Sequence, residues 1–418
     1  MKWTVILLSL PFPLLAGHKF TSSCLNTQKV AIANDSADHG IEWSGAEHKQ
    51  LGDLGFLAAC EELGINNPFC LDEKIERKDG KLKMSYGQLL AMGDFYLHAD
   101  DSYNEKRRLR SISKIFKCID KEGKVHGEQR DTPEVDYPSC TWTNVLHGGK
   151  YLKVVRRNYD HFAWDNMKAY IRFHEMALDY AIQARNQKKE SKKKKLLNRA
   201  LYYNGFADHF LTDAFPAGHL RVPRLDIKRW VKANYGSILK SSIGDALAML
   251  LHDFEGKDLD GNELGMPVKN SLGFAWTTRS DNSLNSCATD RDLHIKMPTL
   301  AVKASNIELW TAFYKGIKPK GVFEATRYVP YPNDLGLVNR WAGLIEGEQG
   351  ERNLSKIRSD LSFPANLILK KKHIRRLFKH LPEVMAQFRD RIEFDLTQDP
   401  SLRDKLPSRY IEGFRNLR

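Results

Sequence analysis

One short segment of the chain places two histidines and an aspartate at spacings that suit metal binding. Within YYNGFADHFLTDAFPAGHLR, His209 and Asp213 are four residues apart, so on a helix both side chains project from the same face. His219 follows six residues later, after a Pro-Ala-Gly sequence that ends the helix and lets the chain turn back. Imidazole nitrogens combined with a carboxylate oxygen suit zinc. The alternative is a His–Asp hydrogen bond in an ordinary core beside an unrelated surface histidine, but the third histidine after the helix break favours a metal site.

Other histidines and acids could complete such a site from distant parts of the sequence. His161 precedes a predicted helix, and His48 and Asp94 lie closer to the N-terminus. His174 lies on the apolar face of its helix, which favours a hydrogen-bonded core histidine, or one that supports the ligands from behind, over a ligand. We therefore take His48, Asp94 and His161 as further candidate metal ligands.

A later helix supplies His252 and an acidic neighbour. On an ideal helix Glu255 shares the face of His252, whereas Asp253 points about 100° away. This geometry prefers Glu255 unless the helix ends before it. Both acids therefore stay candidate ligands beside His252.

Helices are the elements that must position these residues. Apolar residues recur at helical spacing over residues 166–187, 196–215 and 241–254, and helical patterns resume after residue 300 and continue to the C-terminus. Residues 257–292 are rich in Gly, Asn, Asp and Ser and are predicted to form a long loop region. Strand-like alternation is scarce, so the predicted fold class is all-α.

The segment HFLTDAFPAGHLR, together with EHKQLGD around His48 and GDFY around Asp94, resembles the zinc-dependent phospholipase C and P1 nuclease superfamily. More narrowly, it resembles a bacterial branch of phosphatidylcholine-preferring phospholipases C that includes secreted enzymes and effectors of intracellular pathogens. The resemblance covers roughly residues 40 to 280, and its specific part is the pattern H-x3-D-x5-H. It implies an all-helical fold that holds three zinc (Zn²⁺) ions in a cleft.

The resemblance also implies which residues hold the first of these ions. Carried over by position, Asp94, His161 and His209 would hold one ion. Asp213 would bridge two ions.

The remaining ligands implied by the resemblance come from both ends of the motif region. His219 and His252, with an adjacent acid, would hold another ion, and His48 would join the last position. In the superfamily an N-terminal tryptophan also binds zinc, and Trp43 has the corresponding spacing five residues before His48. Cleavage near residue 17 would leave Trp43 internal, without a free amine. Three alternatives then follow: further processing exposes Trp43, its carbonyl binds zinc alone, or another group such as His39 takes its place.

The N-terminus has the layout of a secretory signal peptide. Lys2 is followed by a largely apolar run from Thr4 to Ala16 that ends in small residues. The alternative is a hydrophobic N-terminal helix of the mature fold. The predicted organisation is a signal peptide over residues 1–17, a zinc-dependent hydrolase domain over residues 18–300 and a helical C-terminal region over residues 301–418. The predicted location is therefore extracellular.

Cysteine content and charge fit an exported protein with an acidic partner. Six cysteines permit three disulfides in an oxidising compartment, and Cys60–Cys70 and Cys118–Cys140 are the local candidates. A net charge of +13 favours anionic lipid surfaces or nucleic acid as partners.

Two basic segments stand out in the sequence. The run over residues 188–195 lies between two predicted helices and is interpreted as a solvated loop or helix end. Residues 369–381 set apolar positions against six Lys or Arg. That segment could lie on a membrane surface, but a helix docked on the protein with its basic face in water is the favoured interpretation.

The chemistry expected of such a metal cluster is hydrolysis of a phosphodiester. Zinc lowers the pKa of bound water to about 7 and neutralises charge on phosphate oxygens. Asp94 is the hypothesised general base that orients the attacking water. Arg221, two residues beyond His219, could pair with phosphate or be structural. Phe95 and Tyr96, beside Asp94, are candidate substrate-binding residues.

The predicted reaction is phospholipase C cleavage of phosphatidylcholine-like lipids to diacylglycerol and a phosphorylated head group. The alternative is a single-strand-preferring nuclease with the same metals, because aromatic residues can cage a choline or stack on nucleobases. The motif resemblance favours lipid. A phospholipid membrane surface is accordingly the expected substrate partner, nucleic acid is not expected, and no stable protein partner is predicted.

Overall fold

The computed structural model describes ten stretches and four single positions of the chain. The stretches are residues 45–71, 74–104, 112–113, 115–120, 157–235, 240–256, 265–281, 291–332, 344–361 and 365–417, and the single positions are 154, 259, 284 and 341. Packing divides the chain into residues 1–36 and 37–418, and every described residue belongs to the second unit. The predicted signal peptide, His39, Trp43 and Cys140 lie outside the described residues.

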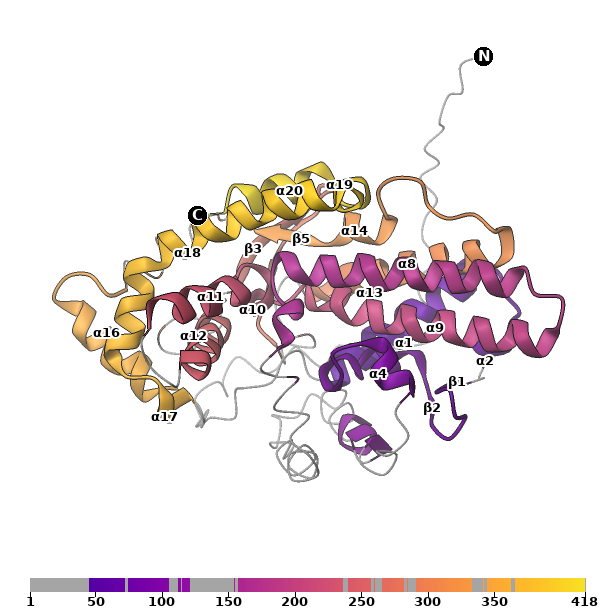
Figure 1. The fold of residues 1–418 in the computed structure, drawn as a ribbon, viewed down its shortest axis with the longest axis horizontal. Helices are drawn as coiled ribbons and strands as arrows, with labels where there is room; N and C mark the ends of the chain where they lie inside the picture. The colour runs from indigo at the N-terminus through magenta and orange to yellow at the C-terminus, as the bar shows by residue number, and fades with distance from the viewer. Residues whose placement is uncertain are drawn as a thin grey trace, which may run out of the picture. The chain divides into compact units, whose positions relative to one another are not determined.

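The described residues are 71% helix and 5% strand, which confirms the predicted all-α class. Figure 1 labels all of the following helices except α3. Their bounds are α1 (Gly45–Glu62), α2 (Pro68–Leu71), α3 (Tyr86–Leu90), α4 (Ala99–Asn104), α8 (Trp164–Arg185), α9 (Glu190–Asp213), α10 (Ala217–Leu220), α11 (Arg224–Asn234), α12 (Lys240–Phe254), α13 (Arg291–Lys315), α14 (Glu324–Tyr328), α16 (Gln349–Ser359), α17 (Ala365–Ile368), α18 (Lys371–Gln398), α19 (Pro400–Lys405) and α20 (Ser408–Arg415). Two short 3-10 helices, η2 (Gly93–Phe95) and η3 (Asn158–His161), also occur in the described stretches. None of the helices in the described stretches is long and apolar enough to cross a membrane.

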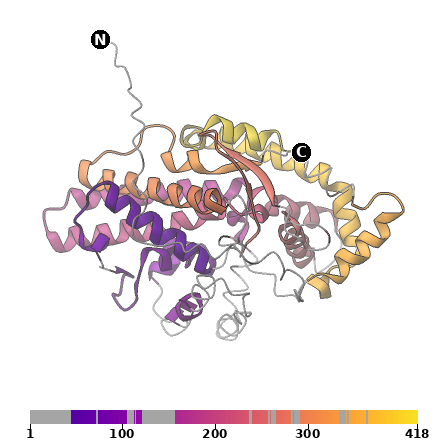
Figure 2. The same cartoon turned by 180° about the vertical axis from the view of Figure 1, so that it is seen from behind.

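The antiparallel helices α8 and α9 form the centre of the fold. Both pack against α13, and α9 also contacts α1 and α3, as Figures 1 and 2 show from opposite sides. The lysine-rich first turns of α9 face solvent, whereas every residue of its second half, from Ala200 to Asp213, is buried. Because several helices surround this half, the polar side chains of His209 and Asp213 are held inside the core.

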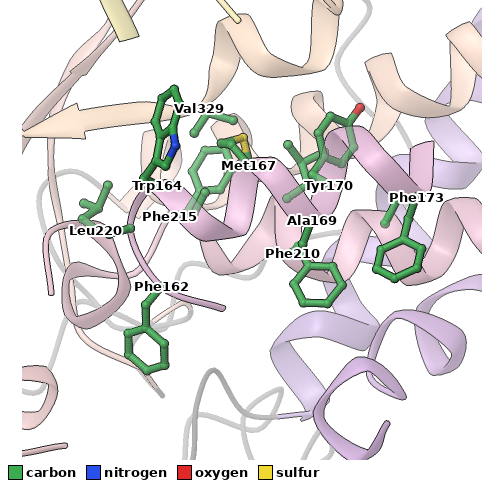
Figure 3. Packing of buried hydrophobic residues seen from close by; sticks show 14 of the residues in the cluster. Phe162, Trp164, Met167, Ala169, Tyr170, Phe173, Phe210, Phe215, Leu220 and Val329 are labelled. Carbon is green, nitrogen blue, oxygen red and sulfur yellow. The ribbon is translucent and has the colours of Figure 1, made fainter. Parts of the chain in front are cut away.

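Aromatic residues fill the space around the end of α9. Phe210, next to His209, stacks on Phe173 of α8 with ring centroids 5.7 Å apart, and Phe206 meets Phe173 edge to face. Figure 3 shows this packing continuing along α8 towards Trp164 and Phe162. Such packing fixes the rotamers of the neighbouring polar residues, since close-packed cores leave few alternatives.

The predicted loop over residues 257–292 is in part a β-hairpin. Strands β3 (Met266–Asn270) and β4 (Ala275–Thr278) pair antiparallel, and β3 also pairs with β5 (Pro330–Pro332). Alternate residues of β3 are buried, a period-two pattern too short to be recognised within a Gly- and Asn-rich stretch. The loop prediction is therefore wrong for these residues. A smaller hairpin is made by β1 (Ile75–Glu76) and β2 (Lys83–Met84).

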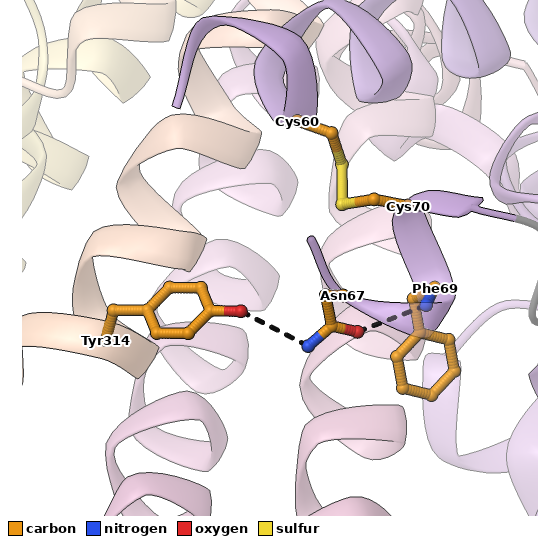
Figure 4. The surroundings of a disulfide bond; sticks show 5 residues. All are labelled: Cys60, Asn67, Phe69, Cys70 and Tyr314. Atoms are coloured by element: carbon orange, nitrogen blue, oxygen red, sulfur yellow. Dashed lines mark hydrogen bonds between the residues drawn. A yellow bond between two sulfur atoms is a disulfide. The ribbon is translucent and has the colours of Figure 1, made fainter. Parts of the chain in front are cut away.

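A disulfide joins the end of α1 to α2. Cys60 and Cys70 are bonded, as predicted from their local spacing, and Figure 4 shows the bond. Beside it, Asn67 donates from its side chain to the Tyr314 hydroxyl at 3.3 Å and accepts from the Phe69 backbone N–H at 3.1 Å. The predicted Cys118–Cys140 pairing involves a residue outside the described stretches, although Cys118 is itself disulfide-bonded.

The C-terminal helices pack against the helices that precede them. The guanidinium of Arg391 on α18 binds Asp165 at 2.7 and 2.9 Å and Asp226 at 2.6 and 2.9 Å. Asp165 belongs to α8 and Asp226 to α11, so one buried cation ties three helices together. The domain boundary predicted at residue 300 falls within α13.

Candidate metal centre

Within the part of the chain that the structure describes, eight buried or half-buried histidine and aspartate side chains converge from separate elements into three groups. Each group places its three ligand atoms within 4.8 Å of one another. We call them the first group (Asp94, His161, His209), the second group (His48, His209, Asp213) and the third group (His219, His252, Asp281). Seven of these eight residues are ligands predicted from the sequence. The groups could hold metal ions.

The carboxylate of Asp213 lies among four imidazoles. One oxygen, Oδ2, is 2.8 Å from His161 Nδ1 and 3.2 Å from His209 Nε2. The other, Oδ1, is 3.4 Å from His48 Nε2 and 3.8 Å from His219 Nδ1. Neither oxygen meets hydrogen-bond geometry with any described residue despite these short distances. A carboxylate so placed can offer one oxygen to each of two cations.

The protonation states in this cluster suit metal ligands. Burial alone raises the pKa of Asp213, but the charges of His209 and His161 outweigh it and hold that pKa well below its usual value. Burial lowers the pKa of His209 well below its usual value, against the attraction of Asp213. The carboxylate is thus ionised and the imidazole neutral at neutral pH, which are the forms that bind a metal.

Asp94 completes the first group from the 3-10 helix η2. Its Oδ1 lies 3.5 Å from His209 Nε2, and His209 Nε2 lies 3.0 Å from His161 Nδ1. A Cβ atom added to the neighbouring Gly93 would come within 2.1 Å of the His209 ring, so only glycine allows this approach.

The third group contains an acid that the sequence did not reveal. Asp281 Oδ2 is 2.7 Å from His252 Nε2 and 3.8 Å from His219 Nε2. Asp281 follows strand β4, and the Arg279 carbonyl accepts from the Ala217 N–H at 2.8 Å, which anchors this segment to the start of α10. No helical spacing links Asp281 to the two histidines, so the sequence contains no local pattern that would have predicted Asp281 as a ligand.

The electrostatics of the third group favour a cation. Burial lowers the pKa of His252, but Asp281 and Asp253 outweigh it and raise that pKa to about 10. Burial raises the pKa of Asp281, and the two histidines more than reverse the effect and lower it. Two carboxylates around one imidazole therefore attract positive charge, whether a proton or a metal ion.

The two acids predicted beside His252 take other positions. Helix α12 ends at Phe254, so Glu255 lies just beyond it. Its carboxylate accepts from Arg221 Nε at 2.6 Å and from Trp341 Nε1 at 2.9 Å, outside all three groups. Asp253 instead accepts from His252 Nδ1 at 2.9 Å and orients that ring. This arrangement differs from the prediction that either acid is a ligand.

The predicted substrate-binding residues differ in their position relative to the three groups. Arg221 is only 1% exposed and is paired with Glu255, which favours the structural alternative over pairing with phosphate. Phe95 and Tyr96 do follow Asp94 directly, with Phe95 half-buried and Tyr96 buried. His174 is a hydrogen-bonded core residue, as predicted, with Asn204 and Glu308 as partners.

Backbone contacts fix the histidines at the turn between η3 and α8. His219 Nδ1 donates to the His161 carbonyl at 2.8 Å, and the Ala163 N–H donates to the His219 carbonyl at 2.6 Å. Ala163 has φ 49°, the only positive φ of a non-glycine residue in the described stretches. Such strain persists only where the surroundings impose it, and it recurs at functional sites.

Thr212 orients His48 in the second group. Its hydroxyl lies 2.8 Å from His48 Nδ1 and 2.9 Å from the Asp208 and His209 carbonyls. Since the hydroxyl proton goes to a carbonyl, the oxygen accepts from His48 Nδ1–H. This bond leaves Nε2 of His48 directed at Asp213.

Replacing Thr212 with valine is expected to weaken metal binding to the second group by about 10–100-fold, because partners behind a metal-binding histidine set its tautomer and orientation. Competition with a chromogenic chelator measures the affinity. Thr299→Val is the matched control, since Thr299 also bonds a helix carbonyl at 2.8 Å but lies away from the groups. Equal affinities for the Thr212 variant and wild type would remove Thr212 from the site.

Comparisons with known proteins give no family for this chain. None of the comparisons with protein-family models, curated proteins and solved structures found a match. The metal and the reaction are therefore inferred from the chemistry of the site together with the resemblance of its motifs.

Proposed function

We propose that this chain is a zinc-dependent hydrolase of phosphodiesters that acts on phospholipids in the manner of a phospholipase C. The observation that carries the proposal is the position of Asp213, which offers its two oxygens to different histidines of adjoining groups. Bridging carboxylates of this kind are typical of sites that bind two or more ions close together.

The donors favour zinc over other divalent ions. The three groups together offer five imidazoles and three carboxylates, and no cysteine is among them. Calcium and magnesium prefer oxygen ligands alone, and copper(I) prefers sulfur. Mixed nitrogen and oxygen donors in a buried setting fit catalytic zinc.

Individual residues of the site have distinct parts in the proposed reaction. The zinc ions would polarise the phosphate and lower the pKa of water at the site. Asp94, whose Oδ1 lies 3.5 Å from His209 Nε2 at the edge of the first group, would accept a proton from the attacking water. Asp213 keeps the first and second groups at a fixed separation, while Thr212 and Asp253 hold His48 and His252 in the required tautomers.

The resemblance of the motifs favours lipid over other phosphodiesters, and two further observations are compatible with it. The motifs around His48, Asp94 and His209 resemble those of phospholipases C. The chain is strongly basic, as suits an enzyme that works at an anionic surface. The Cys60–Cys70 disulfide fits the proposed export to an oxidising compartment where such lipids are accessible.

Replacing Asp94 with asparagine is expected to lower turnover by about 10²–10⁴-fold while zinc content stays mostly intact, because the amide keeps an oxygen ligand but accepts no proton. Steady-state kinetics and metal analysis of the same sample measure the two effects. Asp101→Asn, an exposed aspartate on α4, is the control. Full activity in the Asp94 variant would exclude it as the general base.

A substrate panel tests the proposed function. The purified chain is assayed on phosphatidylcholine and on single-stranded DNA, each with and without a zinc chelator. We expect release of diacylglycerol and a phosphorylated head group, its loss with chelator, its recovery with added zinc, and no cleavage of DNA. Cleavage of DNA without cleavage of lipid would replace the proposal with a zinc-dependent nuclease.

A further inference from the structure

Positive charge is concentrated on one part of the C-terminal region. Residues 349–380 contain nine Lys or Arg and two acidic residues, a net charge of +7 within a chain total of +13. The rest of α18, residues 381–398, contains two arginines and four acidic residues. The charge therefore changes sign along a single helix, and its basic end is the N-terminal one.

This distribution of charge along α18 does not stabilise the helix. The N-terminus of a helix carries partial positive charge, so cations there are unfavourable and acids are preferred. Lys371 and Lys372 nevertheless begin α18, Lys370 precedes them, and the first turn contains no acid. Glu351 pairs with Arg375, and no carboxylate of the described residues forms an ion pair with Lys370, Lys371 or Lys372. Uncompensated cations at this position indicate an anionic partner outside the chain.

An exposed apolar side chain accompanies these lysines. Leu367 on α17 is 74% exposed, three residues before Lys370. Helices α16 and α18 pack against each other, and α17 packs against α12, which carries His252 of the third group (Figures 1 and 2). We give the name α16–α18 surface to six exposed side chains of this region: Leu367, Lys370, Lys371, Lys372, Arg376 and Lys379.

We propose that the α16–α18 surface docks the protein on membranes that contain anionic phospholipids. The lysines bind the negatively charged head groups, and Leu367 inserts at the boundary between head groups and acyl chains. A nucleic acid would match the lysines, but it offers no apolar layer that would bury Leu367. This inference rests on the proposed function and deepens it. Docking at the α16–α18 surface would hold the lipid beside α12, the helix that carries His252.

The test measures vesicle binding by cosedimentation, which requires no hydrolysis. Wild type is mixed with vesicles of phosphatidylcholine alone, with vesicles of phosphatidylcholine and phosphatidylglycerol, and with a single-stranded oligonucleotide. The variant Lys370→Gln/Lys371→Gln/Lys372→Gln removes charge from the surface, and Leu367→Ser removes the apolar side chain. The matched control Lys188→Gln/Lys189→Gln/Lys192→Gln removes the same charge from exposed lysines near the start of α9.

Wild type is expected to prefer the anionic vesicles and to release them at high salt. The triple variant at residues 370–372 should bind them roughly 100-fold more weakly, since each lysine near an anionic surface contributes about a fivefold effect. Leu367→Ser should also weaken binding, whereas the control should stay within about twofold of wild type. Circular dichroism confirms that each variant is folded.

Three results would overturn the docking surface. The first is vesicle binding by the triple variant equal to wild type, and the second is an equal loss in the control. The third is a triple variant that loses binding to the oligonucleotide but not to vesicles, which identifies a nucleic-acid surface instead.

Hydrolysis of monomeric short-chain phosphatidylcholine is followed in parallel. If that activity is absent while the lysines still mediate vesicle binding, the proposed function fails and the docking surface stands.

Discussion

Replacing Asp213 with asparagine is expected to remove zinc from the first and second groups and to lower the rate of phosphodiester hydrolysis by roughly 10²–10⁴-fold. Metal ions contribute several kcal/mol of transition-state stabilisation, and each 1.4 kcal/mol corresponds to about tenfold in rate. Metal analysis of the purified variant and steady-state kinetics measure both effects.

The physical reason is the position of Asp213 among four imidazoles. Its two oxygens lie within 3.4 Å of three histidine nitrogens, so one charge serves two adjoining groups. The amide of asparagine is neutral and presents one N–H₂ where an acceptor is required. That N–H₂ would face either His48 or His161, and one group would lose its oxygen ligand.

Asp208→Asn provides a matched control on the same helix. Asp208 is also fully buried, but its carboxylate accepts from the Tyr86 hydroxyl at 2.6 Å and from Asn306 at 3.2 Å, outside the three groups. Burial raises the pKa of Asp208 to about 7, so a neutral side chain is tolerated there near neutral pH. The Asp208 variant should keep its zinc. Loss of zinc in both variants, or in neither, would contradict the role assigned to Asp213.

Replacing Arg391 with alanine is expected to lower the free energy of unfolding by about 3–5 kcal/mol. Removing one partner of a buried ion pair leaves uncompensated charge in the interior, and this cost is larger than the net contribution of the intact pair. Arg391 is 8% exposed and is the shared partner of Asp165 and Asp226. Burial raises the pKa of Asp165, while Arg391 opposes that effect.

Urea denaturation followed by circular dichroism measures the change. The control is Arg403→Ala, an exposed arginine on α19, for which a change within about 0.5 kcal/mol is expected. A loss below about 1 kcal/mol for Arg391→Ala would show that the two aspartates find other partners or become protonated at little cost. Helix α18 would then contribute less to the fold than its contacts indicate.

Local spacing in the sequence was sufficient to predict which residues lie together where one helix, or two consecutive helices, carry all of them. His209 and Asp213 share a face of α9 because four residues span about one helical turn. The Cys60–Cys70 disulfide closes a loop between consecutive helices, so its partners are near each other in the chain. The fold class follows from helical periodicity in the same way.

Sequence reasoning failed where position depends on an element boundary or on tertiary packing. Glu255 shares the face of His252 only if α12 continues past Phe254, and the helix ends there. Asp281 reaches the third group because β4 is anchored by hydrogen bonds to the turn after α9, including the bond from the Thr278 hydroxyl to the Phe215 carbonyl at 2.6 Å. A contact between distant segments of this kind has no periodic pattern in a single sequence.

The most direct test of the account is anomalous X-ray scattering at the zinc absorption edge from crystals of the purified chain. We expect peaks within the first, second and third groups, with Asp213 between the first two and Asp281 beside the third. Crystals grown with added zinc that show no peak at these residues, or peaks only at the surface, would contradict a metal centre built from these side chains.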